Sequence, residues 1–95
     1  MRNPRLMAVC DELERRKFFR NSYEICLSSL VLEITIQAGE YDYYGVLYIT
    51  HGGNGYEYFM LNPHTQKKIG PVAMDCSAAE FADAITALDF SGLKS

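Results

Sequence analysis

The stretch of sequence that decides the fold is YDYYGVLYITHGGNGYEYFM, residues 41–60. Residues 43–50 and 56–61 are rich in aromatic and β-branched side chains, which favour β-strands. Between them lies Gly-Gly-Asn-Gly at 52–55, and an Asn-Gly pair between two such runs is a strong hairpin signal. The stretch therefore predicts a β-hairpin, and it holds most of the protein's seven tyrosines.

One further strand is predicted on each side of this hairpin. Before it, four aliphatic residues alternate with other side chains, as in a strand with one buried face: Leu30, Leu32, Ile34 and Ile36. After it, residues 68–74 predict a shorter strand, and Pro71 places that strand at a sheet edge because proline has no amide donor. Residues 21–29 are ambiguous: they either extend the following strand or form an irregular lead-in.

Helices are predicted at both ends of the sequence. Asn3 followed by Pro4 is typical of a helix start, and an apolar stripe at helical spacing follows, with the helix ending near residues 16–19. Ser77 and Glu80 have the spacing of a capping box at the start of a second amphipathic helix. We therefore expect a single α+β domain over residues 1–95, with two layers: an N-terminal helix, a four-stranded antiparallel meander sheet and a C-terminal helix.

Composition excludes several classes of protein. The sequence is 48 % hydrophobic and 22 % charged, which argues against disorder, and no apolar run approaches the length of a membrane span. The N-terminus shows no apolar signal-peptide core, so we expect a cytoplasmic protein. Three cysteines without a C-x-x-C spacing indicate free thiols rather than a disulfide framework or zinc site. We expect no cofactor and no metal.

Charge is distributed unevenly along the chain. The net charge is −3, yet residues 21–66 contain Glu24, Glu33, Glu40, Asp42 and Glu57 and neither lysine nor arginine. A segment of this kind repels phosphate and favours basic partners. Basic residues gather instead in residues 1–20, the predicted first helix.

Strand alternation then predicts which residues face away from the helices. Tyrosine hydroxyls need a partner when buried, so Leu47, Ile49, Phe59 and Leu61 are expected inside. The opposite, open face is expected to show Val46, Met60 and tyrosines, bordered by acidic residues. The predicted partner-binding residues are Tyr44, Val46, Tyr48, Tyr56, Tyr58, Met60, Glu33, Asp42 and Glu57. An aromatic patch of this size is typical of an interaction site, although a second copy or residues 21–29 are alternative covers.

The leading functional hypothesis is therefore a small non-catalytic interaction module, an adaptor or inhibitor, that binds a basic protein surface. Formation of a homodimer is the alternative use of the same face. One alternative is a thiol-dependent enzyme that uses Cys76, His51 and Asp75, because the meander gathers these residues at one end of the sheet. Cys26 joins them there if residues 21–29 extend the first strand. Cys76 also precedes the Ser77 cap, where it fits a hydrophobic staple instead. A second alternative is nucleic-acid binding through the basic first helix, although the acidic sheet disfavours direct binding of nucleic acid.

Overall fold

Both predicted helix starts are present in the computed structural model, which describes residues 3–37 and 43–90. The Asn3 side chain caps helix α1 by accepting hydrogen bonds from the amides of Arg5 and Leu6, with Pro4 as the first helical residue. Ser77 and Glu80 form the capping box of helix α2. The elements are α1 (Pro4–Arg15), a 3₁₀ helix η1 (Phe18–Asn21), β1 (Ser22–Leu27), β2 (Leu32–Gln37), β3 (Tyr43–Gly52), β4 (Gly55–Asn62), β5 (Lys67–Met74) and α2 (Ala78–Thr86).

The expected two-layer α+β fold is confirmed, with one correction to the sheet. The strands form an antiparallel meander in the order β1-β2-β3-β4-β5, so the sheet has five strands and not four. The additional strand, β1, is formed by most of the ambiguous segment 21–29 and pairs edge to edge with β2. That segment therefore extends the sheet in its own plane and does not cover the open face. As Pro71 indicated, β5 lies at the opposite edge.

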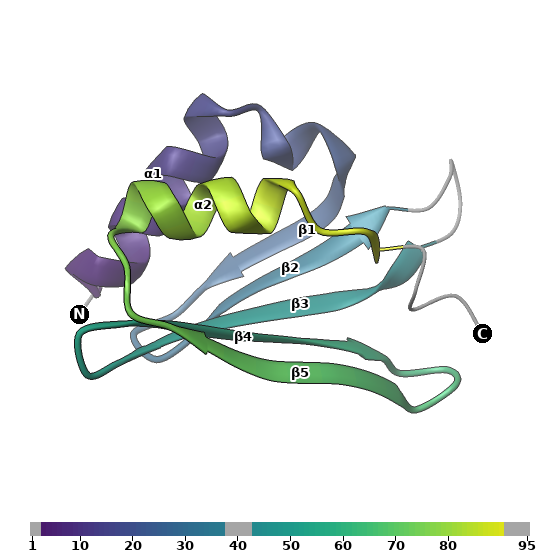
Figure 1. Ribbon diagram of the computed structural model, residues 1–95. Coiled ribbons are helices and arrows are strands. Elements are labelled where there is room, and N and C mark those ends of the chain that lie inside the picture. Colours follow the sequence, from purple (N-terminus) through teal and green to yellow (C-terminus); the bar gives the residue numbers. More distant parts are fainter. Residues whose placement is uncertain (1–2, 38–42, 91–95) are drawn as a thin grey trace.

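The two helices lie side by side on one face of the sheet (Figure 1). The apolar stripe of α1 is fully buried at Leu6, Val9 and Leu13, and α2 contributes Phe81 and Ile85, also with no exposed surface. These side chains meet Leu32, Ile34, Leu47 and Ile49 of the sheet in one core. Each large apolar side chain contributes a transfer free energy of about 1.5–3 kcal/mol when it is fully buried. This helix–sheet contact is therefore the main stabilising feature of the fold.

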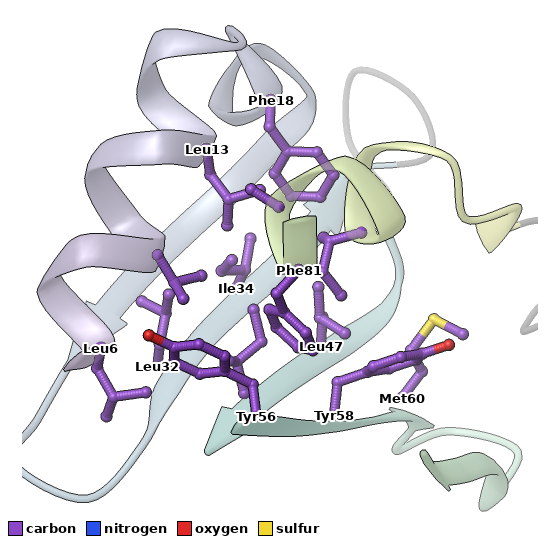
Figure 2. Packing of buried hydrophobic residues seen from close by; sticks show 14 of the residues in the cluster. Leu6, Leu13, Phe18, Leu32, Ile34, Leu47, Tyr56, Tyr58, Met60 and Phe81 are labelled. Atoms are coloured by element: carbon purple, nitrogen blue, oxygen red, sulfur yellow. The ribbon is translucent and has the colours of Figure 1, made fainter. Parts of the chain in front are cut away.

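The predicted faces are correct for β3 and wrong for β4. Leu47 and Ile49 are buried as expected, but Tyr56, Tyr58 and Met60 are buried with them, at 6 %, 9 % and 3 % exposure. Figure 2 shows Tyr56 and Tyr58 beside Phe81. Their ring centroids lie 5.1 and 6.0 Å from the centroid of the Phe81 ring. Phe59 and Leu61, expected inside, are instead partly exposed on the opposite face.

Hairpin geometry explains the reversal. Gly52 pairs with Gly55, so the loop has two residues, and every odd-numbered residue of β3 faces an even-numbered residue of β4. Directly paired residues share a face, so the pairs Leu47–Met60 and Ile49–Tyr58 must enter the core together. The tyrosines of β4 were expected outside because a buried hydroxyl needs a hydrogen-bond partner. Tyr56 has such a partner: its hydroxyl donates to the backbone carbonyl of Arg5 at 3.1 Å.

Leu30 is a second correction. It was expected to face the helices, but it lies in the turn between β1 and β2 and is 78 % exposed. The Ser28 amide donates to the Val31 carbonyl at 3.0 Å, and the Ser28 hydroxyl accepts from the amides of Leu30 and Val31. A serine side chain that binds nearby backbone in this way favours a turn over a continuing strand.

Candidate protein-interaction surface

The sheet face that carries no helix is the candidate functional surface. We call it the open face, and its members follow from strand pairing, because residues opposite one another share a face. In Figure 1 both helices lie on the other side of the sheet. The open face consists of Glu24, Cys26, Glu33, Thr35, Val46, Tyr48, Thr50, Glu57, Phe59, Leu61, Lys68 and Ala73.

A pair of stacked rings forms the centre of the open face. Tyr48 and Phe59 are directly opposite one another on β3 and β4, with ring centroids 4.7 Å apart and planes inclined by only 16°. The Lys68 ammonium lies 4.7 Å from the centroid of the Phe59 ring. Beside the rings, Val46 pairs with Leu61, so four apolar side chains form one contiguous, partly exposed patch. Such a patch contributes to binding when a partner removes it from water.

Acidic groups border this patch on the side of β1 and β2. Glu33 is the cross-strand neighbour of Tyr48, and Glu24 lies on the exposed edge strand. Removal of the phenol from water and the nearby Glu33 carboxylate both raise the pKa of Tyr48. Glu57 adds a third carboxylate on β4, whereas the one basic residue of the open face is Lys68 on β5. The charge of the open face is therefore acidic over β1–β4 and basic only at the β5 edge.

The predicted site residues are divided by the fold. Val46, Tyr48, Glu33 and Glu57 lie on the open face. Asp42 and the side chain of Tyr44 lie outside the described part of the chain. The three core residues of β4 discussed above belong to the hydrophobic core and are withdrawn as partner-binding residues.

Among the open-face residues that sequence reasoning missed, Phe59, Leu61 and Lys68 lie at or beside its aromatic centre. The signal that identifies the first two was present in the sequence, because any two-residue loop at 52–55 pairs odd-numbered positions with even-numbered ones. Once Leu47 and Ile49 are assigned to the core, that rule leaves Phe59 and Leu61 outside. The position of Lys68 on the open face depends on the register of β5. A β-bulge opposite residues 58–60 shifts that register.

A second cluster joins the start of α1 to the β3–β4 hairpin. The Arg5 guanidinium donates to the carbonyls of Gly53 at 3.0 Å and Gly55 at 2.7 Å, and it lies 5.1 Å from the centroid of the Tyr56 ring. The imidazole of His51 is held between the Asn3 side-chain amide at Nε2 and Arg5 Nη1, which lies 3.3 Å from Nδ1. These contacts fix the helix layer on the sheet, so the cluster has a structural role.

This cluster removes His51 from the proposed thiol site. Both ring nitrogens lie against the side chains of Asn3 and Arg5, so neither is directed to Cys76 as a general base. Burial and the nearby Glu80 and Asp75 carboxylates raise the pKa of Cys76, which disfavours the thiolate. Cys76 instead packs, partly buried, against the hydrophobic core. Cys26 lies across the sheet on the open face, opposite Glu33.

The basic residues of α1 are also engaged. Arg15 and Arg16 both bind Glu12, at 2.6 and 2.9 Å, and these hydrogen bonds hold the pKa of Glu12 below its usual value. Arg16 additionally binds Asp83 of α2 at 2.8 Å. With Arg5 directed to the hairpin carbonyls, these three arginines already have protein partners. Arg5 and Arg16 are therefore engaged within the protein, whereas the Arg15 side chain remains 69 % exposed.

Comparisons with the profiles of known protein families, with curated proteins and with solved structures found no match to this chain. Within residues 3–37 and 43–90, no three histidine, cysteine or acidic side chains are grouped closely enough to hold a metal ion. Neither described helix has the length and apolar character needed to cross a membrane. Fold and surface together define the class: a two-layer α+β protein with an apolar, acid-bordered sheet face.

Proposed function

We propose that this protein is a non-catalytic interaction module, an adaptor or inhibitor, whose working surface is the open face. The observation that carries the proposal is the stacked Tyr48–Phe59 pair with Val46 and Leu61 on a face that neither helix covers. Tyrosine and phenylalanine are enriched at protein interfaces, where a partner shields them from water. The fold itself is stabilised by the opposite face, so these four side chains are free to serve binding.

We infer a partner with a basic surface from the charges around the patch. Glu24, Glu33 and Glu57 surround the apolar centre on the side of β1–β4. Arginine and lysine side chains of a partner would pair with these carboxylates at the rim, which guides association more than it adds affinity. Lys68 at the far edge would in turn face an acidic group of the partner.

The alternative of an enzyme has less support. A thiol nucleophile needs a lowered pKa and an adjacent base, whereas the pKa of Cys76 is raised and His51 is engaged by Asn3 and Arg5. The alternative of nucleic-acid binding has less support as well. Phe59 already stacks against Tyr48 and lies beneath the Lys68 ammonium, and the carboxylates near the rings would repel phosphate.

Affinity capture from the native host with paired variants tests the proposal. The double variant Tyr48→Ser/Leu61→Ser removes half of the apolar patch, and both side chains point away from the core. Val72→Ser is the matched control, because Val72 is exposed at 38 % but belongs to the helix-covered side of the sheet, opposite Tyr58. We expect a partner that wild type and Val72→Ser both capture and that the double variant does not.

Salt provides a second criterion in the same experiment. Pairing between the open-face carboxylates and a basic partner weakens as ionic strength rises from about 0.05 to 0.5 M, because charges at the rim are screened. A partner captured equally by wild type and the double variant would refute the open face as the working surface. Capture through the open face that does not respond to salt would refute the basic partner alone.

A further inference from the structure

The two edges of the sheet differ in how they prevent pairing with another strand. At the β5 edge, Pro71 lacks an amide, Gly70 forms part of a bulge with φ 97°, and Lys67 and Lys68 add charge. Proline, bulges and lysines are the devices with which proteins block edge strands. The β1 edge has no proline or lysine and bears a bulge only at its start, between Ser22 and Glu24.

Hydrogen-bond alternation shows what the β1 edge presents. The Ser28 amide bonds the Val31 carbonyl, so Ser28–Val31 is a hydrogen-bonded pair, and the next such pairs back along the ladder are Cys26–Glu33 and Glu24–Thr35. The intervening residues, Ile25 and Leu27, therefore direct their backbone amides and carbonyls away from β2. Within the described chain no sixth strand pairs with this edge.

The side chains of this edge are incompletely buried as well. Ile25 continues the apolar row of Leu47 and Ile34 across the inner side of the sheet. Both of those residues have no exposed surface, whereas Ile25 is 42 % exposed. A core row that ends in an exposed isoleucine next to free backbone groups is suited to continuation by another strand.

We propose that β1 pairs with β1 of a second copy of this chain, antiparallel, about a twofold axis at Ile25, to form a continuous ten-stranded sheet. In this register Ile25 lies opposite the partner's Ile25 and forms both backbone hydrogen bonds with it, because its amide and carbonyl face outwards. Glu24 lies opposite the partner's Cys26, so no like charges oppose one another. The interface is thus self-complementary, as a twofold dimer requires.

This inference does not depend on the proposed function of the open face. Pairing takes place in the plane of the sheet, so it leaves the open faces of both copies uncovered and side by side. A partner with two basic surfaces would then gain affinity from simultaneous binding. The two proposals can fail separately, since one depends on residues at the sheet edge and the other on residues at the centre of the open face.

The first test is the mass in solution of wild type and three variants by sedimentation equilibrium. We expect wild type to reach twice the 10.8 kDa of one chain. Ile25→Lys places two ammonium groups across the axis from each other and should weaken the dimer by at least about tenfold. Val72→Lys makes the same change at the other edge, at similar exposure, and Tyr48→Ser alters the open face. Both should leave the dimer intact.

A second measurement uses the unaltered protein, so it holds even if Ile25→Lys fails to fold. Amide hydrogen exchange of Ile25 and Leu27 should slow as protein concentration rises, because these amides acquire acceptors only in the dimer. Wild type that stays monomeric, a dimer that survives Ile25→Lys, or a dimer in which these amides stay unprotected would overturn the proposal. Loss of the dimer in Tyr48→Ser would assign dimerisation to the open face instead.

Discussion

Two consecutive residues of β4, Met60 and Leu61, test the division of the sheet into a core face and an open face. Met60 is 3 % exposed within the core, and Leu61 lies partly exposed opposite Val46 on the other side. Each is replaced by alanine, which keeps strand geometry and removes only the side chain. If the faces are assigned correctly, neighbours in sequence should differ severalfold in their cost to stability.

The expected magnitudes follow from burial. Removal of a buried methionine side chain loses about 1.5–3 kcal/mol of transfer free energy. The cavity left beside its cross-strand neighbours Leu47 and Ile69 increases the cost, so Met60→Ala should lower the free energy of unfolding by about 2–4 kcal/mol. Leu61 leaves no closed cavity, so Leu61→Ala should cost about 0.5–1 kcal/mol.

Urea denaturation followed by far-UV circular dichroism measures the difference. With a slope of about 1–1.5 kcal/mol per molar for a chain of this size, the midpoint should fall by about 2 M for Met60→Ala and by about 0.5 M for Leu61→Ala. All three proteins are compared at one concentration, because any self-association would add to the apparent stability. Equal midpoints for the two variants, or a greater loss for Leu61→Ala, would show that the face assignment is wrong.

Three further predictions concern the helix contact, the open face and the thiols. Arg5→Ala should lower the free energy of unfolding by about 1–2 kcal/mol through lost hydrogen bonds to the hairpin carbonyls, measured by the same denaturation; unchanged stability would contradict that role. In absorbance titrations that compare wild type with Tyr48→Phe, the raised pKa of Tyr48 should fall towards its ordinary value in Glu33→Gln. Because Tyr48 loses its proton at lower pH in the unfolded chain than in the folded one, the free energy of unfolding should decline as pH rises above about 10. A pKa of Tyr48 that is the same in Glu33→Gln as in wild type would contradict the influence of the Glu33 carboxylate. Cys76 should react with a thiol reagent near neutral pH more slowly than the exposed Cys26, and faster labelling of Cys76 would revive the thiol enzyme.

Features of the fold that depend on local chemistry could be read from the sequence. The Asn3–Pro4 helix start and the Ser77–Glu80 capping box satisfy backbone groups within one turn, so a few neighbouring residues determine them. Pro71 placed its strand at an edge for a similarly local reason. The α+β fold then followed from the order of two amphipathic helices and the alternating strands.

Features that depend on pairing between strands were harder to read. The bulge between Ser22 and Glu24 and the serine turn at Ser28 interrupt the alternation of β1, so its pattern did not stand out as a strand. The faces of β4 were assigned from the cost of burying a hydroxyl. That cost was met by the Arg5 carbonyl, which reaches Tyr56 only after α1 has packed on the sheet.

The candidate site shows the same division. Val46, Tyr48 and Glu33 could be assigned to the open face from the sequence, because their strands alternate regularly, whereas alternation on β4 put Glu57 on the same side as Phe59 and Leu61. The register of the hairpin determines which residues of β4 lie on the open face. In this register Phe59 and Leu61 lie there, whereas Tyr56, Tyr58 and Met60 are buried. The surface is accordingly less rich in tyrosine than the sequence suggests, and its aromatic centre is one stacked pair.

Hydroxyl-radical footprinting tests the central claim, that the open face is the binding surface, most directly. It is applied to the protein alone and to the complex recovered by affinity capture from the native host. We predict that Tyr48, Phe59 and Leu61 are oxidised in the free protein and protected in the complex, while Leu30, exposed in the β1–β2 turn, is oxidised in both. Continued oxidation of Tyr48, Phe59 and Leu61 in the complex would contradict the account.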